Sequence, residues 1–437
     1  VSKSVDNEVG DGTTSSVVLA GALIEKAEEL INKEVHPSVI VDGYTAAGEQ
    51  ALKILQRMAI KVDVDDKDTL IKIATTSMYS KLVSDDSPTL SQIVVNATRQ
   101  VAEKSNEGQA LKVDLDNIKV EKKAGGSIHD TKLIKGIVLD KEVVHAGMPK
   151  RIEGARIALL NSALEIEKTE MSAEIRINDP QQMQMFLEEE NKMLKSMVEK
   201  IKSSGANVVL CQKGIDDIAQ HYLAKAGVLV VRRVKESDMF KLSKATGARI
   251  VSNLDDLVKG DLGLADLVEE RKVETDKWVF IEGCKNPKSV TILIRGGSQR
   301  VVDEADRSVH DALMVVKDVL EKPAIVAGGG APEAYISNET RQWSNNLEGR
   351  AQLAVHKFAE ALDSIPLALA ENAGMDPIDT MTDLRSKQGK RGKWIGVDVR
   401  NTVVADMFKE NVVEPLAVKE QIIKSAVEAA CMILRVD

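Results

Sequence analysis

Apolar residues recur at the spacing of one helix face near both ends of the chain. Leu19, Leu23, Ala27 and Leu30 follow one another at steps of four, four and three residues. Side chains at these steps share one face of a helix, so the pattern predicts an amphipathic helix there. The same pattern predicts further helices over residues 39–58, 67–75, 90–104, 302–320, 348–372 and 418–434.

The middle of the chain, from about residue 134 to residue 290, has a different pattern. Short runs rich in Val, Ile and Leu replace the helical spacing there and predict buried strands. These runs cover residues 157–160, 208–210, 228–231, 279–281 and 290–294. Because helical segments separate the runs, we expect βα units and an α/β domain. A hairpin is expected later, over residues 394–404.

The helical ends and the α/β centre together indicate a multidomain α and α/β fold. A chain of 437 residues exceeds the roughly 250 to 300 residues that one hydrophobic core supports. We therefore expect the centre to be a domain inserted into a mostly helical one. Two chain crossings would then let the centre move relative to its flanks.

One predicted helix in the centre carries a run of methionines. Asp179 and Pro180 supply an N-cap and a first-turn proline, which are common at helix starts. Met183, Met185 and Met193 then share the helix with three consecutive glutamates. Flexible methionine side chains suit a surface that re-packs against varied partners. An ordinary amphipathic core helix explains the same pattern.

Charge and cysteine content narrow the function classes. A net charge of −9 and a pI near 5.5 argue against nucleic acid as the main partner, because nucleic-acid binders usually present a basic face. Cys211, Cys284 and Cys431 lie far apart and fit a reducing, cytoplasmic compartment. Neither a membrane-spanning apolar run nor a signal-peptide pattern occurs. The chain opens at Val1 without a preceding strand, and we expect that an N-terminal piece precedes it.

The sharpest local signal is the segment Gly10-Asp11-Gly12-Thr13-Thr14, which leads into the first long helix. Its glycines let the backbone approach a ligand, and the helix N-terminus offers N–H groups and a partial positive charge to phosphate. Asp11 would repel bare phosphate, so a Mg²⁺ ion between its carboxylate and the phosphate explains its presence. A capped turn, in which Asp11 or Thr13 satisfies the helix N-terminus, explains the same residues. The spacing differs from that of a Walker A loop.

Two other features carry little weight alone. Gly328, Gly329 and Gly330 follow an apolar run, and a triple glycine more often forms a turn than a nucleotide contact. Asp311 lies in a predicted helix, where a carboxylate on the solvated face is the simplest explanation. Their weight increases once the other motifs of the chain are considered together.

Several short motifs occur in the order found in the group II chaperonins of archaea, the thermosomes. The chain resembles this family over essentially all of its 437 residues. The segments that carry the resemblance are residues 10–14, 212–217, 220–222, 283–288, 295–297, 327–330, 371–379, 415–419 and 432–435. The resemblance implies an ATP-dependent molecular chaperone.

The resemblance also implies three domains. They are an equatorial ATP-binding domain (1–63 and 324–437), an intermediate hinge domain (64–135 and 288–323) and an apical substrate-binding domain (136–287). The first would be mostly helical, the second a small α/β domain, and the third an inserted α/β domain. A helical lid protrusion would occupy about residues 165–193 of the apical domain, which favours the partner-surface reading of the methionine helix.

An ATPase site follows from the same resemblance. Asp11 would bind Mg²⁺ with the nucleotide, and Asp311 would orient the attacking water when the hinge closes. Lys81 would sense the γ-phosphate, and Glu414 would lie by the ribose hydroxyls. The remaining contacts would be Gly10, Gly12, Thr13 and Thr14 at the phosphates, Gly329 against the nucleotide, and Gly396 and Asp398 near the adenine.

The implied assembly is a double-ring cage of the same or related subunits, eight or nine in each ring, which encloses non-native proteins. The family's equatorial domain begins with some tens of residues, including a second phosphate loop, that do not occur in this sequence. A polypeptide without them would bind ATP poorly and hydrolyse little. Two alternatives stay open, namely a non-hydrolysing holdase or filament-forming scaffold, and a metabolic ATP-using enzyme or kinase with an inserted domain.

Overall fold

The computed structural model of the chain contains two compact units, which we call the helical unit and the mixed unit. The residues that the structure describes are 1–79, 84–104, 111–166, 180–285 and 287–436. The helical unit comprises residues 1–98, 102–115 and 303–437, and the mixed unit comprises residues 99–101 and 116–302. The three predicted domain ranges stay predictions.

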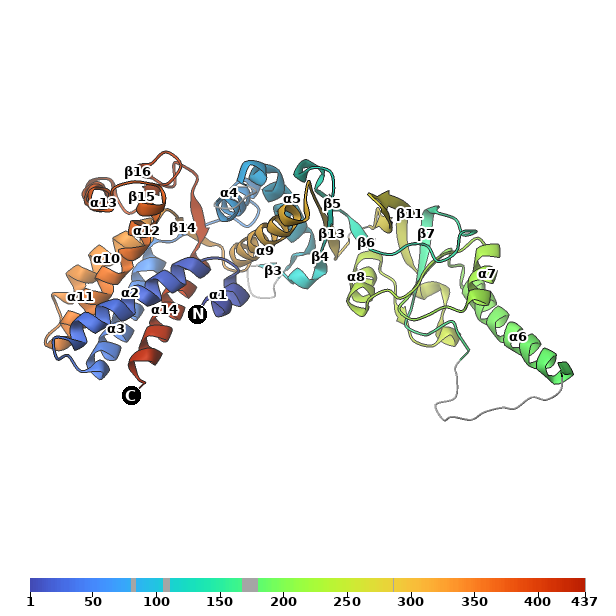
Figure 1. Ribbon diagram of the computed structural model, residues 1–437. Coiled ribbons are helices and arrows are strands. Elements are labelled where there is room, and N and C mark those ends of the chain that lie inside the picture. The colour runs from blue at the N-terminus through green and yellow to red at the C-terminus, as the bar shows by residue number, and fades with distance from the viewer. Residues whose placement is uncertain (80–83, 105–110, 167–179, 286, 437) are drawn as a thin grey trace. The chain divides into compact units, whose positions relative to one another are not determined.

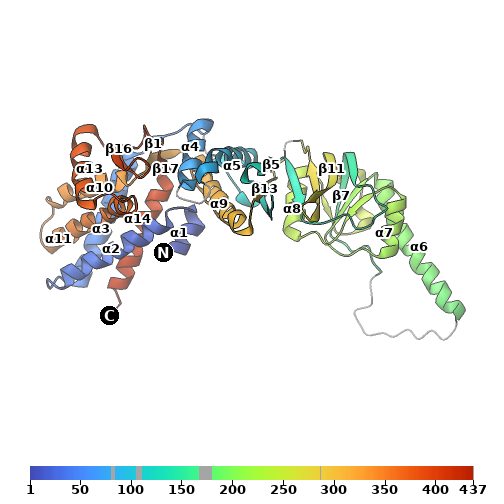
Figure 2. The same ribbon diagram turned by 45° about the horizontal axis from the view of Figure 1, so that its top comes forward.

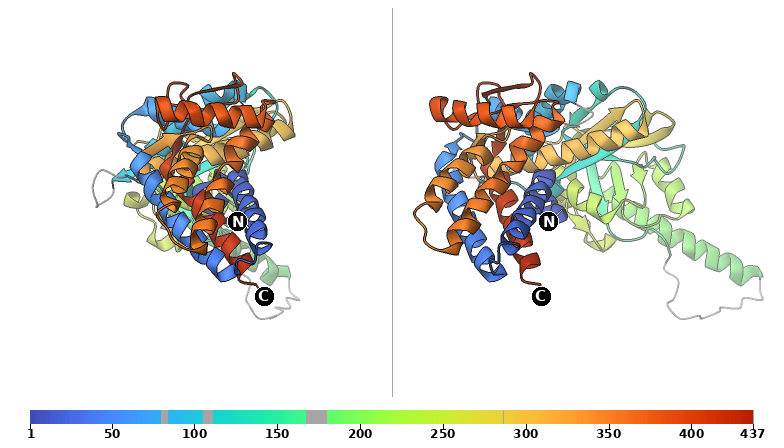
Figure 3. Two further views of the ribbon diagram at one scale, coloured as in Figure 1. Left: turned by 90° about the vertical axis from the view of Figure 1, so that its left-hand side faces the viewer. Right: turned by 60° about the vertical axis from the view of Figure 1, so that its left-hand side comes forward.

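The helical unit is built mainly from helices that lie against one another (Figures 1 and 3), and their apolar residues are buried. Tyr44 is fully buried between them, where its ring lies edge-on to Phe358 and its hydroxyl donates a hydrogen bond to the Leu23 carbonyl at 2.8 Å. The helices are α1 (Ser2–Val9), α2 (Thr13–Ile31), α3 (Pro37–Met58), α4 (Lys67–Met78), α5 (Ser87–Val101), α9 (Gln299–Glu321), α10 (Ala331–Ser344), α11 (Arg350–Leu362), α12 (Ser364–Asn372), α13 (Pro377–Arg391) and α14 (Leu416–Leu434).

A small antiparallel sheet joins distant parts of this unit. Its order is β1 (Ile60–Lys61), β14 (Ala324–Ala327) and β17 (Val413–Pro415). Val326 pairs with Glu414, so the chain segments on either side of the four helices α10 to α13 meet here. The predicted hairpin is confirmed as β15 (Ile395–Asp398) and β16 (Val403–Asp406). A further two-stranded pair joins β2 (Glu103–Lys104) to β3 (Leu111–Lys112).

The mixed unit contains a seven-stranded sheet in the order β6-β12-β11-β7-β8-β9, with β10 paired to β7 (Figure 2). Strands β7 to β10 are parallel, as the βα pattern predicts, whereas β6, β11 and β12 run antiparallel to their neighbours. The strands are β6 (Gly136–Leu139), β7 (Arg151–Leu160), β8 (Val208–Cys211), β9 (Leu229–Val231), β10 (Ile250–Val251), β11 (Gly263–Val273) and β12 (Asp276–Glu282). The helices of this unit are α6 (Pro180–Ser204), α7 (Asp217–Lys225) and α8 (Glu236–Thr246).

The single α/β block expected from the pattern of the central strands differs from the structure in two respects. The run at residues 290–294 forms β13 (Val290–Gly296), which lies in a separate sheet between β4 (Ile118–Ala124) and β5 (Lys132–Ile134). Strand β11 was not expected, because its side chains alternate between buried and exposed and leave no continuous apolar run. It forms a hairpin with β12, so no helix separates these two strands.

The methionine helix α6 has two different halves. It begins at Pro180, while Asp179 and part of the predicted lid segment lie outside the described residues. Leu194 and Ile201 in its second half are fully buried, so that half packs as an ordinary core helix. Its first half extends beyond the rest of the mixed unit and exposes Met183, Met185, Phe186, Leu187 and Met193 (Figures 1 and 2). The prediction of an ordinary amphipathic core helix is therefore confirmed for the second half of α6 only.

Two predicted helices have different ends in the structure. The segment 90–104 forms α5, which ends at Val101 and is followed by β2. The segment 348–372 is broken at Asp363 into α11 and α12, because Pro366 has no N–H to donate to the carbonyl one turn earlier. In the described parts of the chain, no helix is both long and apolar enough to cross a membrane.

Candidate functional site

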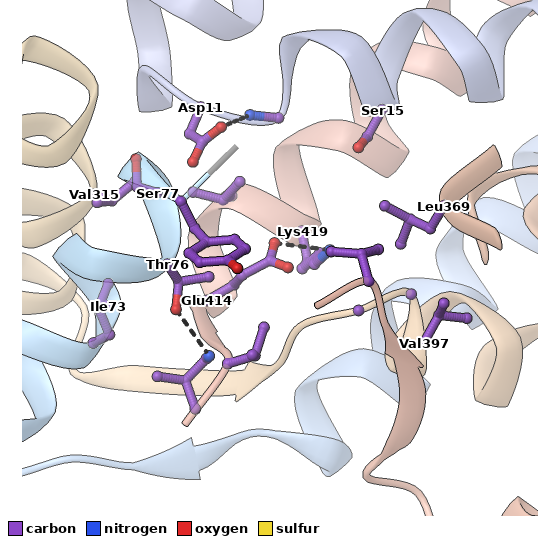
Figure 4. A pocket seen from close by; sticks show the side chains of 18 of the residues that line it. Asp11, Ser15, Ile73, Thr76, Ser77, Val315, Leu369, Val397, Glu414 and Lys419 are labelled. Atoms are coloured by element: carbon purple, nitrogen blue, oxygen red, sulfur yellow. Dashed lines mark hydrogen bonds and ion pairs between the residues drawn. The ribbon is translucent and has the colours of Figure 1, made fainter. Parts of the chain in front are cut away.

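A cavity of about 490 Å³ lies in the helical unit, where seven segments of the chain converge (Figure 4). Its walls come from the loop before α2 with the start of that helix, from α4, from α9, from the turn between β14 and α10, from α12, from the β15–β16 hairpin, and from β17 with the start of α14. These segments are far apart in the sequence. The cavity therefore depends on the helical packing and the small sheet that bring them together.

The loop before α2 has a backbone that only glycines adopt easily. Gly10 has a φ of 68° and Gly12 a φ of 79°, both in the left-handed region. A Cβ atom at Gly12 would lie 2.6 Å from Ile422 Cδ1, and one at Gly10 would lie 2.4 Å from Met314 Cβ. Both positions thus combine an unusual backbone with close packing, which brings the start of α2 against α9 and α14.

Asp11 does not cap α2. Its Oδ1 accepts a hydrogen bond from the Gly12 N–H at 2.7 Å, and the N-cap residue Gly12 makes no side-chain cap. The capped-turn alternative is therefore not what the structure contains. The first N–H groups of α2, at the residues Thr13, Thr14 and Ser15, have no carbonyl partner within the helix. Since Thr14 and Ser15 line the cavity, this helix end presents donors and a partial positive charge to it.

The triple glycine forms a tight turn on the opposite wall. Gly329 and Gly330 have φ values of 64° and 70°, and both line the cavity. A Cβ at Gly329 would lie 2.3 Å from Met407 Sδ, so no larger residue fits. The Gly329 carbonyl accepts a hydrogen bond from the Val397 N–H at 2.8 Å, which joins the turn to the hairpin. The turn then leads directly into α10.

In the hairpin, Asp398 lines the cavity but uses its carboxylate to shape the turn. Its Oδ1 accepts from the Arg400 N–H at 2.9 Å, and its Oδ2 accepts from Asn401 Nδ2 at 2.7 Å. The Arg400 guanidinium lies 3.4 Å from the centre of the Tyr79 ring, in a cation–π contact. Arg400 and Tyr79 both line the cavity, so this contact connects the hairpin to the end of α4.

An ion-pair cluster occupies the wall formed by β17 and α14. Lys419 Nζ lies 2.8 Å from Glu414 Oε2 (Figure 4) and 2.9 Å from Glu333 Oε1. Burial raises the pKa of Glu414 above its ordinary value, although the Lys419 charge opposes this. Burial alone would lower the pKa of Lys419, but the two carboxylates outweigh it and raise this pKa. Lys419 therefore stays charged.

The wall formed by α4 consists of small polar side chains and Tyr79. Thr76 Oγ1 accepts a hydrogen bond from the Val413 N–H at 3.3 Å and donates one to the Lys72 carbonyl at 2.9 Å. Ser77 also lines the cavity, and its hydroxyl is buried without a hydrogen-bond partner among the described residues. An unpartnered buried hydroxyl at a cavity wall is available to a ligand.

Comparison with known proteins decides the family. A family model described as the TCP-1/cpn60 chaperonin family matches residues 1–437. The chain belongs to this family. It is 56% identical over 437 residues to thermosome subunit beta of Thermococcus kodakarensis, a match that covers 100% of this chain and 80% of that protein. Thermosome subunit alpha of Archaeoglobus fulgidus is also 56% identical, with the same coverage.

A solved structure agrees with this assignment of the chain to the chaperonin family. The open state monomer of a group II chaperonin from Methanococcoides burtonii has a TM-score of 0.71 and 46% sequence identity, covering 98% of this chain and 100% of that one. The predicted archaeal group II chaperonin and its multidomain α and α/β fold are therefore confirmed. The predicted function class, a subunit of an ATP-dependent chaperone that assembles into rings, is also confirmed, and the holdase or scaffold alternative is not favoured.

The chaperonin fold brings most of the predicted site residues to one cavity. Those that line it are Asp11, Gly12, Thr14, Gly329, Asp398 and Glu414. Gly10, Thr13 and Gly396 lie just behind the wall, and a Cβ at Gly396 would be 2.7 Å from the Gly329 carbonyl oxygen. Asp311 is half-buried on α9, one turn before Val315, which does line the cavity. Lys81 lies outside the described residues.

Several cavity residues were not expected from the sequence, among them Thr76, Tyr79, Arg400 and Lys419. A hydroxyl run at residues 75–77, at the end of the helix predicted over residues 67–75, was the available signal for the α4 wall. Arg400 gave no signal, and Lys419 gave only its place in the family segment 415–419, because a charged residue in a turn or a helix is usually solvated surface.

The cavity suits a magnesium ion that is held jointly with a phosphate ligand. Within the described residues, no group of three or more His, Cys, Asp or Glu side chains could hold a metal by itself. Asp398 serves the hairpin turn and Glu414 pairs with Lys419. Of the other two lining carboxylates, Asp11 and Glu410, Asp11 is the one that directly precedes the N-terminus of α2. Mg²⁺ in nucleotide sites commonly takes only one or two carboxylates, with phosphate and water as its other ligands.

Proposed function

We propose that this chaperonin subunit binds MgATP in the cavity and hydrolyses it to drive the folding of enclosed proteins. The arrangement that carries the proposal is the N-terminus of α2 with Asp11, which opens into the same cavity as the Gly329 turn and Glu414. A helix end, a glycine turn and a metal-compatible carboxylate together match the three needs of a bound triphosphate, which are donors, close backbone approach and a counter-ion.

Each part of the nucleotide has a proposed partner. The phosphates lie against the α2 N-terminus, where Gly10, Gly12, Thr13 and Thr14 supply backbone and hydroxyl donors. The remaining contacts are Gly329 against the nucleotide, Glu414 at the ribose hydroxyls, and Gly396 and Asp398 near the adenine. Asp398 contributes through the turn that its carboxylate holds, because that carboxylate is already occupied by Arg400 and Asn401.

Hydrolysis needs a carboxylate that orients water. Asp311, on α9, accepts a proton of the water as the water oxygen attacks the γ-phosphorus. The bond from that phosphorus to the β,γ-bridging oxygen breaks, and ADP and phosphate leave. Lys81 contributes positive charge at the γ-phosphate. Mg²⁺ bound by Asp11 and the phosphates would offset the negative charge of the phosphoryl oxygens.

Hydrolysis is proposed to be coupled to movement of the predicted domains. The hinge domain carries Asp311, so its closure over the nucleotide completes the site and delays hydrolysis until the closed state. Same or related subunits form stacked rings of eight or nine, and the lid protrusions close over a non-native protein client. The three cysteines are free and buried, which supports a reducing, cytoplasmic location.

The decisive test is the replacement Asp311→Ala in the assembled protein. ATP binding should stay within about threefold of the original, whereas turnover should fall by roughly a hundredfold or more, the usual range for loss of a general base. His310→Ala is the matched control, because His310 is exposed at the neighbouring position of α9. Binding is measured by calorimetry and turnover by phosphate release.

Undiminished turnover in the Asp311→Ala protein would remove this residue from the mechanism. Absence of ATP binding to the unmodified assembly would contradict the proposed site as a whole. Electron micrographs of the same preparation test the assembly, since stacked rings of eight or nine subunits are expected and isolated monomers would contradict the proposal.

A further inference from the structure

Lys419, Glu333 and Glu414 form a cluster in which one ammonium group serves two carboxylates. Lys419 Nζ lies 2.9 Å from Glu333 Oε1 and 2.8 Å from Glu414 Oε2. Lys419 and Glu333 are only 5% and 3% exposed, whereas Glu414 is 24% exposed. Glu414 lines the cavity and Glu333 does not. Of the two carboxylates, only Glu414 can therefore meet a ligand.

The cluster ties together three elements that frame the cavity. Glu333 lies in the first turn of α10, Glu414 on β17, and Lys419 in the first turn of α14. One turn further along α14, Ile422 packs against Gly12 of the phosphate-side loop. The position of the ammonium is thus fixed by the same helix that supports the opposite wall of the cavity.

The position of the Glu414 carboxylate depends on this ammonium. Its Oε2 pairs with Lys419, while its Oε1 lies beside Gly328, where a Cβ atom would be only 2.7 Å away. Glu333 competes for the same ammonium through its Oε1. Its Oε2 is buried without a hydrogen-bond partner among the described residues. Without Lys419, two carboxylates would share a largely buried space, so one of them would take up a proton or turn away.

We propose that Lys419 is a positioning residue that makes the site selective for the ribose of its nucleotide. This inference rests on the proposed function, in which Glu414 accepts hydrogen bonds from the ribose hydroxyls. By pairing with Oε2, Lys419 holds Glu414 ionised at the cavity wall, and an ionised carboxylate makes stronger hydrogen bonds than a neutral one. A nucleotide without one of the hydroxyls leaves this acceptor unsatisfied and binds less well.

The test compares ATP with 2′-deoxy-ATP and 3′-deoxy-ATP in the assembled protein. The unmodified protein should favour ATP over at least one analogue by roughly tenfold in KM, since a hydrogen bond to a charged group is at stake. In Lys419→Met this preference should fall to within about twofold. The kcat for ATP should change by less than about threefold, because a ribose contact is made equally in the ground and transition states.

A second variant keeps the test valid if the first one folds poorly. Lys419→Met combined with Glu333→Gln removes one positive and one negative charge, so no unpaired carboxylate of Glu333 stays buried. It should lose the ribose preference as well. In a Glu414→Gln background, Lys419→Met should have no further effect on the preference, because Lys419 acts through Glu414. Lys393→Met is the matched control, since the Lys393 ammonium donates to the Met58 carbonyl at 3.1 Å outside the cavity lining.

The outcomes separate the two proposals. Absence of ATP binding to the unmodified protein would contradict the proposed function itself. A protein that binds ATP but distinguishes neither deoxy analogue would overturn the ribose role of Glu414 and the role of Lys419 with it. If the unmodified protein distinguishes them and the Lys419→Met, Glu333→Gln protein keeps the full preference, the role of Lys419 is overturned and the ATP site stands.

Discussion

At the scale of single residues, glycines decide how closely the walls of the cavity approach one another. Gly12 and Gly329 both have a positive φ, and both lie where a Cβ atom would meet a neighbouring side chain closer than 3 Å. Gly21, in the middle of α2, has open space around it. Gly12 and Gly21 of the same chain segment therefore have opposite roles. Gly12 permits the close packing of the site, whereas Gly21 only weakens the helix.

Replacing Gly12 or Gly21 with alanine should change the free energy of unfolding in opposite directions. Gly12→Ala should lower the free energy of unfolding by roughly 2–4 kcal/mol, through backbone strain and the contact with Ile422, and should weaken ATP binding. Gly21→Ala should raise it by about 0.5–1 kcal/mol, because alanine favours a helix interior. Denaturant unfolding of each variant measures both values. Equal effects would show that α2 does not pack as described.

Asp318 is an acidic residue with an unusual environment on α9. It is buried, its Oδ2 has no hydrogen-bond partner among the described residues, and burial raises its pKa from 3.8 to about 7. Lys317 and Lys322 lower this pKa, whereas Glu321 on α9 and Glu8 on α1 raise it. The folded state thus holds a proton that the unfolded chain releases near pH 4. Stability should fall as the pH rises from about 4 to 7, and should then stay level.

The replacement Asp318→Asn should remove this pH dependence. At pH 8 the variant should be more stable than the original by roughly 2–4 kcal/mol, the free energy that corresponds to a shift of about three pKa units. At pH 5 the gain should be about half as large or less. Denaturant unfolding at the two pH values gives the comparison. A gain of equal size at both would mean that Asp318 does not titrate between them.

At the scale of elements, α6 shows how one periodic pattern can serve two environments. Met193 and Leu194 are neighbours in the sequence, but Met193 is 51% exposed and Leu194 is fully buried. The N-terminal half has no sheet beneath it, so its apolar side chains stay open, which favours a partner surface.

Replacing Met193 or Leu194 with glutamine should change the free energy of unfolding by very different amounts. Met193→Gln should change the free energy of unfolding by no more than about 0.5 kcal/mol, because it touches little of the core. Leu194→Gln should cost about 3 kcal/mol or more, since it removes core volume and buries an amide. Thermal unfolding measures both, and binding of an unfolded client should weaken in Met193→Gln. A large loss of stability in that protein would place Met193 in the core.

At the scale of the whole molecule, the chain enters and leaves the seven-stranded sheet of the mixed unit at one edge, through β6 and β12. The core that covers β6 to β12 runs from Ile137 to Cys284, entirely inside the predicted apical range. Gly136 at one end of that range pairs with Glu282 near the other, so the chain enters and leaves at adjacent strands. This is the arrangement expected of an inserted domain.

The fragment 136–287 should therefore fold by itself. It keeps its complete core and all seven strands of the sheet, so we expect one cooperative thermal transition and a circular dichroism spectrum with both helix and strand signals. A fragment cut at residue 262 loses β11 and β12 and should stay unfolded. Failure of the longer fragment to fold would contradict the predicted domain boundaries.

The sequence by itself determined the local structure and the family. Periodic apolar positions located most of the helices and the parallel strands, because burying one face requires a spacing that neighbouring residues reveal. The glycine loop before α2 was likewise visible, since its backbone needs are local. The Asp376-Pro377 start of α13 offered the same cap signal as the methionine helix, and the structure confirms it with hydrogen bonds to two backbone N–H groups. This helix start could therefore have been predicted from the sequence.

Only the tertiary structure decided what surrounds the cavity. The pairing of Val326 with Glu414 spans four helices, and it places Lys419 between two carboxylates that are 81 residues apart in the chain. Residues 415–419 carry part of the family resemblance, but nothing near Lys419 assigns its side chain to a buried cluster rather than to a solvated helix face. Its surroundings come from long-range packing, and the free energy of a charge depends on those surroundings rather than on its neighbours along the chain.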